Sequence, residues 1–322
     1  MSALAQTHTT PAAAKTKTFT ELNALSPIAN ILVHILLILG CLCCIVPLWI
    51  VISASLTQEQ ALVMNGYGFW PTKFSFSAYT YLFQSGGGAI GVAYKNTIIS
   101  TLVGTSLCTV SVALYAYPIS RPDFRYRKFF TFFSFFTMLF NAGTIAFYML
   151  CTQILNLKNT LYALFLPLSF SAYWVIIMRT FYRSNVPDSV IESARIDGAG
   201  EWRTYLQIVA PLALPGFATV ALFAAVSVWN NYFFCLLLVN DRAHINLQYT
   251  ISEILKSVQY LKEMASSASG AGQAAGQMAL GDMPAESFRM AMAVATMGPV
   301  LLAYPFFQKY FVKGLTMGAV KG

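Results

Sequence analysis

The segment NVPDSVIESARIDGAGEWRTYLQIVAPLALPG, residues 185–216, is a polar stretch that lies between two long apolar runs. No charged residue follows Arg203 before Asp241, and none lies between Phe129 and Leu157. A chain that otherwise avoids charge therefore concentrates it in one short region. The charged residues of the stretch are Asp188, Glu192, Arg195, Asp197, Glu201 and Arg203.

The composition of the whole chain predicts a membrane protein. Of its 322 residues, 57% are hydrophobic and 10% are charged, whereas a soluble domain has about a quarter charged residues. A helix needs about 20 apolar residues to cross a bilayer core of about 30 Å. The apolar runs lack the alternation of a transmembrane barrel, so we expect an all-α integral membrane fold. Six runs are long enough to span: 30–53, 96–119, 129–151, 160–180, 209–233 and 289–308.

The distribution of positive charge predicts the orientation of these spans. Cytoplasmic loops are enriched in Lys and Arg, and six spans place both termini on one side. Of the 20 Lys and Arg residues, thirteen lie on the side of the termini, which we therefore expect to be cytoplasmic. The net charge of +8 then reflects orientation, and no nucleic-acid partner is expected. The thirteen are Lys15, Lys17, Arg121, Arg125, Arg127, Lys128, Arg179, Arg183, Arg195, Arg203, Lys309, Lys313 and Lys321.

The spans lack the groups that ion-driven transport and catalysis use. Proton relays and ion-coupled pumps normally need ionisable groups inside the membrane, and the only candidate is His34, for which a packing role is favoured. No zinc-protease pair of histidines is present, and no Gly-Lys dipeptide occurs, which excludes a Walker-type phosphate loop. The six cysteines lie in apolar runs and imply neither a metal site nor disulfides. We expect no enzyme activity, cofactor or metal; any nucleotide binds to another chain.

The polar stretch itself predicts a short helix. Pro187 suits the first turn of a helix and Asp188 its positive end, and Gly198 ends it. Ala194 and Gly198 would leave a face with almost no side chain, which another protein could approach closely. Glu192 and Arg195, one turn apart, are candidates to pair.

A second short helix, 201–209, leads through Pro211 and Pro215 into the fifth apolar run. The arrangement predicts a lever that carries rigid-body motion from a docked partner into the membrane. The alternative is an amphipathic loop helix that lies on lipid headgroups.

The stretch ESARIDGAGEWRTYLQIVAPLALPG resembles the EAA loop of ABC importer permeases, whose pattern is Glu-Ala-Ala, three residues, Gly, nine residues, Ile, two residues and Pro. Ser193 replaces the usual second Ala, and Ala210 stands where Leu is common. In that family the loop forms the coupling helix, which docks on the ATPase subunit. The residues in register are Glu192, Ala194, Gly198, Ile208 and Pro211.

The resemblance extends over about residues 25–322. YKNTIISTLVGTSLCTVSVALYAYPISRPDFRYRK is similar to the second span of carbohydrate-importer permeases, and NLKNTLYALFLP and VWNNYFFCLLLV follow the same group. The tail YPFFQKYFVKGLTMGAVKG is similar to the oligosaccharide and polysaccharide branch, alongside maltose-type permeases. One departure is at 142–146, where AGTIA replaces the Gly-Gly-x-Ile-Pro common in that branch; the missing proline would change a kink in the third span.

The resemblance implies a type I ABC importer permease of a bacterial inner membrane, which works by alternating access. Its partners would be ATP-binding cassette ATPase subunits, a second homologous permease and an extracytoplasmic solute-binding protein, and its substrate a carbohydrate, with an oligosaccharide favoured. The expected parts are a cytoplasmic tail (1–25), a six-helix domain (26–322) with its core at about 90–310, a coupling loop (185–211) and an outer loop (240–287). An ion-coupled secondary transporter of a small solute and a membrane scaffold remain the alternatives.

Two sets of site residues follow from this reading. Polar and aromatic residues of the spans could line the path of the sugar, although buried Asn residues also commonly bond membrane helices together. The path candidates are Asn96, Asn141, Tyr173, Trp229, Asn230 and Asn231. By resemblance, the candidates for contact with the ATPase are Glu192, Ser193, Ala194, Asp197, Gly198 and Ala199.

Overall fold

The computed structural model describes residues 27–85, 87–140, 142–267 and 284–319. The expected tail (1–25), Asn141 and most of the small-residue segment after Met264 lie outside the described residues. The chain divides into two compact units, residues 1–50 and 51–322. In the described parts, the only extended pairing is a single antiparallel bridge between Thr57 and Phe74, so the expected all-α fold is confirmed.

The first unit holds most of α2, Pro27–Ser55. This helix contains the predicted first span, 30–53. Its large apolar side chains are exposed, for example Leu36, Leu39 and Ile45. An apolar surface of this kind suits a lipid environment rather than water.

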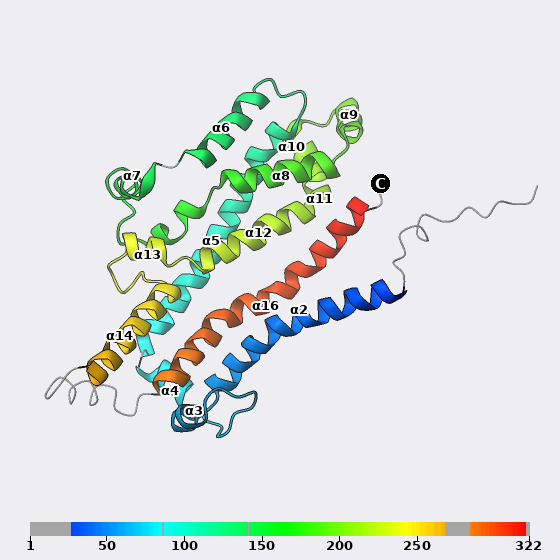
Figure 1. Ribbon diagram of the computed structural model, residues 1–322. Coiled ribbons are helices and arrows are strands. Elements are labelled where there is room, and N and C mark those ends of the chain that lie inside the picture. Colours follow the sequence, from blue (N-terminus) through cyan, green and yellow to red (C-terminus); the bar gives the residue numbers. More distant parts are fainter. Residues whose placement is uncertain (1–26, 86, 141, 268–283, 320–322) are drawn as a thin grey trace, which may run out of the picture. The chain divides into compact units, whose positions relative to one another are not determined.

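The second unit is built on two long helices and three bent pairs (Figure 1). The helices α5, Gly87–Ser120, and α16, Ala285–Ala319, contain the predicted second and sixth spans. By length and composition, three described helices can each cross a membrane, and the number rises to six if each bent pair is one span. The sequence prediction of six spans is therefore met only if each bent pair counts as one span, since three of the apolar runs are interrupted.

The interruptions lie where proline or special backbone geometry interferes with the helix. The third run consists of α6, Arg127–Leu139, α7, Gly143–Met149, and the π-turn η1, Leu150–Ile154; Gly143 has φ of 81°. In the fourth, the short 3₁₀ turns η2, Leu161–Leu164, and η3, Leu166–Leu168, precede α8, Ala172–Asn185, with a bend of 50°.

The fifth run is bent as well. It comprises α10, Glu201–Thr204, the π-turn η4, Tyr205–Val209, α11, Ala210–Leu212, and α12, Leu214–Trp229. The chain turns by 77° between Leu212 and Leu214. Because proline lacks the backbone donor and restricts the residue before it, Pro211 and Pro215 favour a break here. The predicted helix 201–209 is thus present, but it meets α12 at a steep angle.

Shorter helices gather at the end of the unit where α5 begins (Figure 1). They are α3, Glu59–Asn65, α4, Ser77–Ser85, α13, Phe233–Leu238, and α14, Leu247–Ser267, and α14 confirms the helix predicted over 248–264. The Glu59 carboxylate accepts hydrogen bonds from the backbone N–H groups of Glu286, at 2.9 Å, and Ser287, at 2.8 Å. This anion satisfies free donors in the first turn of α16, so α3 fixes the start of the last helix.

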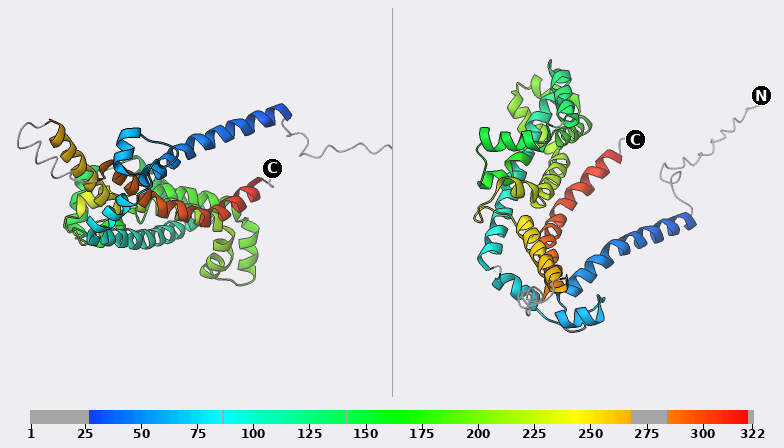
Figure 2. Two further views of the ribbon diagram at one scale, coloured as in Figure 1. Left: turned by 90° about the horizontal axis from the view of Figure 1, so that it is seen from below. Right: turned by 60° about the vertical axis from the view of Figure 1, so that its left-hand side comes forward.

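The core of the unit is formed by α5, α8 and α12, and α12 lies between α5 and α16 (Figures 1 and 2). Buried residues at helical spacing on α5, such as Cys108, Val112 and Ala116, pack against Met178 and Tyr182 of α8. A Cβ placed on Gly104 of α5 would lie 2.7 Å from the Phe165 Cβ and 3.2 Å from Val228. The backbone of α5 therefore approaches Phe165, between η2 and η3, as closely as only glycine permits, and Val228 of α12 packs tightly at the same point.

Substitution of Gly104 by alanine should destabilise the bundle. The added methyl group has no space, and overpacking of this kind costs about 1–3 kcal/mol. Gly91→Ala is the matched control, because it lies on the same helix with nothing within 4 Å of its Cβ. We expect thermal unfolding in detergent to show a lower transition temperature for Gly104→Ala alone. Equal transition temperatures for the two variants would contradict this packing.

Candidate functional site: the α9 helix and its support

The polar stretch forms α9, Asp188–Ile196, at the end of the unit opposite α4 and α14 (Figure 1). Pro187 occupies the position just before the helix, with ψ of 139°, one residue earlier than expected. Asp188 lies in the first turn and Arg195 in the last, so both charges complement the helix dipole. The helix stops where predicted, at Gly198, whose φ of 77° is a left-handed conformation.

The predicted bare face of α9 is not formed. Ala194 is only 5% exposed and Ile191 2% exposed, because both point into the core of the unit. Gly198 lies beyond the helix, with nothing within 4 Å of a Cβ added to it. Ala194 therefore holds α9 against the bundle, whereas Gly198 lies at the surface. The remaining candidates at the surface are Glu192, Ser193 and Asp197, all exposed, and Ala199, partly exposed.

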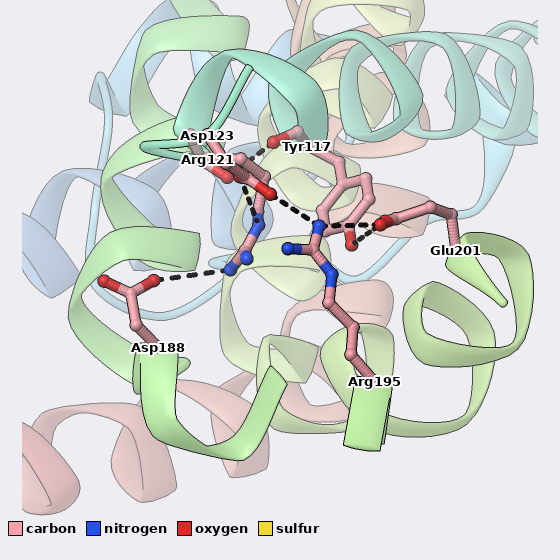
Figure 3. Close-up of polar contacts among 7 residues, drawn as sticks. Tyr117, Arg121, Asp123, Asp188, Arg195 and Glu201 are labelled. Atoms are coloured by element: carbon pink, nitrogen blue, oxygen red, sulfur yellow. Dashed lines mark hydrogen bonds and ion pairs between the residues drawn. The ribbon is translucent and has the colours of Figure 1, made fainter. Parts of the chain in front are cut away.

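The proposed pair of Glu192 and Arg195 is also wrong, because Arg195 has two other partners (Figure 3). Its Nη2 donates to Asp123 Oδ2 at 2.5 Å and to Glu201 Oε1 at 2.8 Å. Asp123 lies in the turn between α5 and α6, and Glu201 begins α10. We call these three residues the Arg195 clasp; it joins three segments that the chain separates.

Further contacts tie the clasp to the end of α5 (Figure 3). Arg121, at the end of α5, donates through Nη1 to Asp188 Oδ1 at 3.3 Å, and its Nε lies 3.5 Å from Asp123 Oδ1. The Tyr117 hydroxyl donates to Glu201 Oε2 at 3.2 Å. Both ends of α9 are thereby fixed to α5, so displacement of α9 must displace the end of that helix.

Asp123 and Arg195 of the clasp stay ionised around neutral pH. Partial burial raises the pKa of Asp123, but the hydrogen bond from Arg195 and the charge of Arg121 outweigh it and leave the pKa below its usual value. Hydrogen bonds from Arg195 to Glu201 and Asp123 raise the Arg195 pKa. A depressed carboxylate pKa gives stability above the unfolded-state value, about 3.9, and this stability is lost as the pH falls through the folded value. The Asp123–Arg195 ion pair of the clasp is therefore charged around neutral pH and weakens only in acid.

Two of the predicted path residues, Asn96 and Asn231, bond to the protein's own backbone. Asn96, which is buried, donates through Nδ2 to the carbonyls of Ala243, at 2.9 Å, and Ile245, at 3.0 Å. Asn231, also buried, donates to the Leu164 carbonyl at 3.1 Å and accepts from the Phe234 N–H. These contacts are the helix-joining alternative that the sequence left open.

The other path candidates differ in exposure. Trp229 is 6% exposed and its Nε1 donates to the Thr296 carbonyl at 3.1 Å, so this indole joins α12 to α16. Tyr173 is 52% exposed. Asn230 is exposed and accepts from Gln248 Nε2 at 3.4 Å, a weak contact. Asn141 lies outside the described residues. Only Tyr173 and Asn230 thus keep polar groups accessible to a solute.

Comparison with known proteins decides the family. Residues 108–317 match the family described as the binding-protein-dependent transport system inner membrane component. The chain belongs to this family. A type I ABC importer permease is what the sequence resemblance implied, and the permease is an integral inner-membrane transport component rather than a soluble protein or a scaffold.

Individual relatives align with nearly the whole length of the permease. It is 35% identical, over 91% of its length and 98% of the relative's, to the polygalacturonan/rhamnogalacturonan transport system permease protein YtcP of Bacillus subtilis. It is 33% identical to the protein LplC of the same organism, over 86% and 90% of the two chains. A crystal structure of a bacterial ABC transporter involved in the import of the acidic polysaccharide alginate matches with a TM-score of 0.72 and 30% identity, over 89% and 99% of the chains.

The supporting network of the permease could not be read from spacing in the sequence. Asp123 is 72 residues from Arg195 in the sequence. Glu201 lies six residues after Arg195, and residues six apart do not share a face of a helix. The basic turn SRPDFRYRK does hold one acid among four cations, and that lone Asp123 is the signal that marked a specific contact. The exposed side chains of Ile196 (86%) and Trp202 (69%) were likewise not singled out, although both extend the surface beside the clasp.

Removal of the clasp should loosen α9 without unfolding the permease. Two exposed ion pairs contribute about 0.5 kcal/mol each, so we expect Arg195→Gln to speed amide hydrogen exchange in α9 about fivefold at pH 7. Arg203→Gln is the control, because the Arg203 side chain bonds only to Gln207, one turn along its own segment. If both variants leave exchange in α9 unchanged, the clasp does not hold the helix.

The two neighbouring asparagines at the end of α12 should behave differently. Asn231→Ala removes buried hydrogen bonds and should lower stability by about 1–2 kcal/mol, seen as an earlier thermal transition. Asn230→Ala removes only a long exposed contact and should unfold like the wild type. An equal loss of stability in both variants would show that Asn230 is also a structural residue.

Proposed function

We propose that this permease forms half of the translocation path of an ATP-driven importer for an oligosaccharide. ATP hydrolysis takes place on separate ATP-binding cassette subunits, a homologous permease supplies the other half, and a solute-binding protein delivers the sugar. The observation that carries the proposal is α9, a surface helix fixed at both ends to a membrane span by the Arg195 clasp and the Arg121–Asp188 pair.

The geometry suits transfer of force from outside the bundle. The backbone of Gly198 is open to a partner, with Glu192, Ser193, Asp197 and Ala199 around it, while Ala194 on the opposite face anchors the helix. A docked ATPase that moves would carry α9, the α5–α6 turn and α10 together. Because the 77° bend separates α10 from α12, this motion reaches α12 as a change of tilt, a hinge-type transition.

The substrate class rests on the relatives and on what the path residues can do. YtcP is named for polygalacturonan and rhamnogalacturonan, and the matching crystal structure for alginate. Acidic polysaccharides are the chemistry that these names share, so an oligosaccharide with carboxylate groups is the substrate we propose. Tyr173 offers an exposed ring for stacking on a sugar, and Asn230 an amide for hydroxyl groups. Asn96, Trp229 and Asn231 hold the surrounding helices.

The orientation follows from the same placement of charge. The turn at 121–128, the end of α8 and the α9–α10 segment gather cations at one end of the unit (Figure 1), which we assign to the cytoplasm. The α16 helix starts beside α3 at the opposite end, where Glu59 binds its first turn. The C-terminus then lies on the cytoplasmic side, and the N-terminus is proposed to lie there too.

Gly198 should be required for transport but not for folding. Any side chain there is strained at φ of 77° and projects into the space that a partner would fill. We expect Gly198→Val to lower ATP-dependent uptake at least tenfold in vesicles holding the complete importer, with normal insertion. Gly200→Val is the control, since it has equally open surroundings but φ of −70°. Unchanged uptake with Gly198→Val would refute the role of α9.

The transport proposal itself is tested by omission. Vesicles that contain both permeases, the ATPase subunits and the binding protein should accumulate labelled oligogalacturonate only with ATP. Uptake should stop when any one component is left out. If this permease alone carries solute with a proton or sodium gradient and no ATP, the secondary-transporter alternative is correct.

A further inference from the structure

A second group of arginines lies beside the Arg195 clasp, and of this group only Arg121 contacts a clasp residue, Asp123, within the described part of the chain. Arg121, Arg127 and Arg183 line a cavity of about 320 Å³. Arg121 and Arg127 lie at the two ends of the turn between α5 and α6, whereas Arg183 lies at the end of α8, far from them in the sequence. Tyr117 and Tyr182 also line this cavity, which we call the arginine pocket.

The charges of the arginine pocket are not balanced by the protein. The single carboxylate that lines it is Asp188, which is paired with Arg121. Within the described part of the chain, Arg127 and Arg183 form no ion pair with any acid. Their positive charges also act on Arg179, whose Nε donates only to the Ile119 carbonyl. Like charges held together without counterions are unfavourable, so an anion at this place would be bound favourably.

Arg121 gives a second, independent sign of an incomplete site. The residue is 9% exposed, and its buried Nε, although 3.5 Å from the Asp123 carboxylate, makes no hydrogen bond to the described residues. Buried donors are nearly always satisfied. An oxygen acceptor in the pocket that Arg121 lines would satisfy this group and compensate its neighbours at the same time.

The position of the pocket indicates the kind of anion. Its lining residues lie where α5 and α8 reach their cytoplasmic ends, at the depth of lipid headgroups if these helices span the membrane. Tyrosine is favoured at this depth, because its ring lies among apolar chains and its hydroxyl faces polar groups. Arginine forks match the oxygens of a phosphate group. Cytoplasmic leaflets also carry anionic lipids that basic clusters attract.

We propose that the arginine pocket binds a phosphate group, supplied by the headgroup of an anionic phospholipid of the cytoplasmic leaflet. Pro187, Asp188 and Ile191 form one wall of the pocket, so the bound phosphate lies against the start of α9. The lipid thereby completes the support of the helix on the side that the Arg195 clasp leaves open. Retention of lipid is a property of the permease alone and does not depend on the proposed transport function.

The test measures lipid binding to the full permease, purified in neutral detergent and stripped of lipid. Native mass spectrometry would follow titration with phosphatidylglycerol and, separately, with phosphatidylcholine. Each arginine near such a surface strengthens binding about fivefold, so the double variant Arg127→Gln/Arg183→Gln should bind phosphatidylglycerol about 30-fold more weakly. The matched control is Arg125→Gln/Lys128→Gln, which removes two charges from the same region but none from the pocket. It should lose much less affinity than the pocket variant does.

The remaining measurements decide the source of the phosphate group and the specificity of the pocket for an anionic headgroup. If millimolar inorganic phosphate displaces bound phosphatidylglycerol as strongly as added lipid does, the pocket is a phosphate site, but its ligand is free phosphate rather than a lipid headgroup. Equal binding of the two lipids by the wild type would overturn the proposal, as would equal losses in the pocket and control variants. Loss of ATPase assembly in the pocket variant, with lipid binding unchanged, would assign the arginines to the protein partner and overturn it too. If the Gln variant does not fold, Arg127→Lys/Arg183→Lys keeps the charge, loses the forked geometry, and should weaken binding severalfold.

Discussion

The attachment of α9 to the membrane bundle is the constraint on which the rest of this permease depends. Arg195 holds Asp123 and Glu201, and Arg121 holds Asp188, so a helix of nine residues is bound at both ends to the tip of α5. These ion pairs are mostly exposed and contribute little free energy individually. Their importance is geometric, because they join three separate segments of the chain to one another.

A displacement of these joined segments would act on the bends in the apolar runs. A straight helix would transmit a push only along its own axis, whereas the fifth run turns by 77° between α11 and α12. The close approach of α5 to α12 at Gly104 and Val228 means that α12 cannot tilt without affecting α5. The clasp, the bend and this contact therefore connect α9 continuously to the interior of the bundle.

Polar groups within the bundle serve mainly to join its helices. Asn96, Asn231 and Trp229 all bond to backbone carbonyls of other segments, where lipid could offer no partner. A path for a sugar must then be lined by groups left accessible, and Tyr173 and Asn230 meet that condition. The division between joining and lining residues depends on exposure, which identical residue types at adjacent positions, such as Asn230 and Asn231, do not share.

The sequence by itself determined the helical membrane class, the approximate extent of the apolar runs, the helix over 188–196 and its end at Gly198, because hydropathy, proline and glycine act locally. Tertiary structure alone decided that Ala194 faces inward, that Arg195 bonds to Asp123 rather than Glu192, and that three runs are bent. Each of these depends on which segments pack together over long separations in the chain. The sequence period of a helix indicates which residues share a face. Which other segment covers that face depends on how all the helices of the bundle pack together.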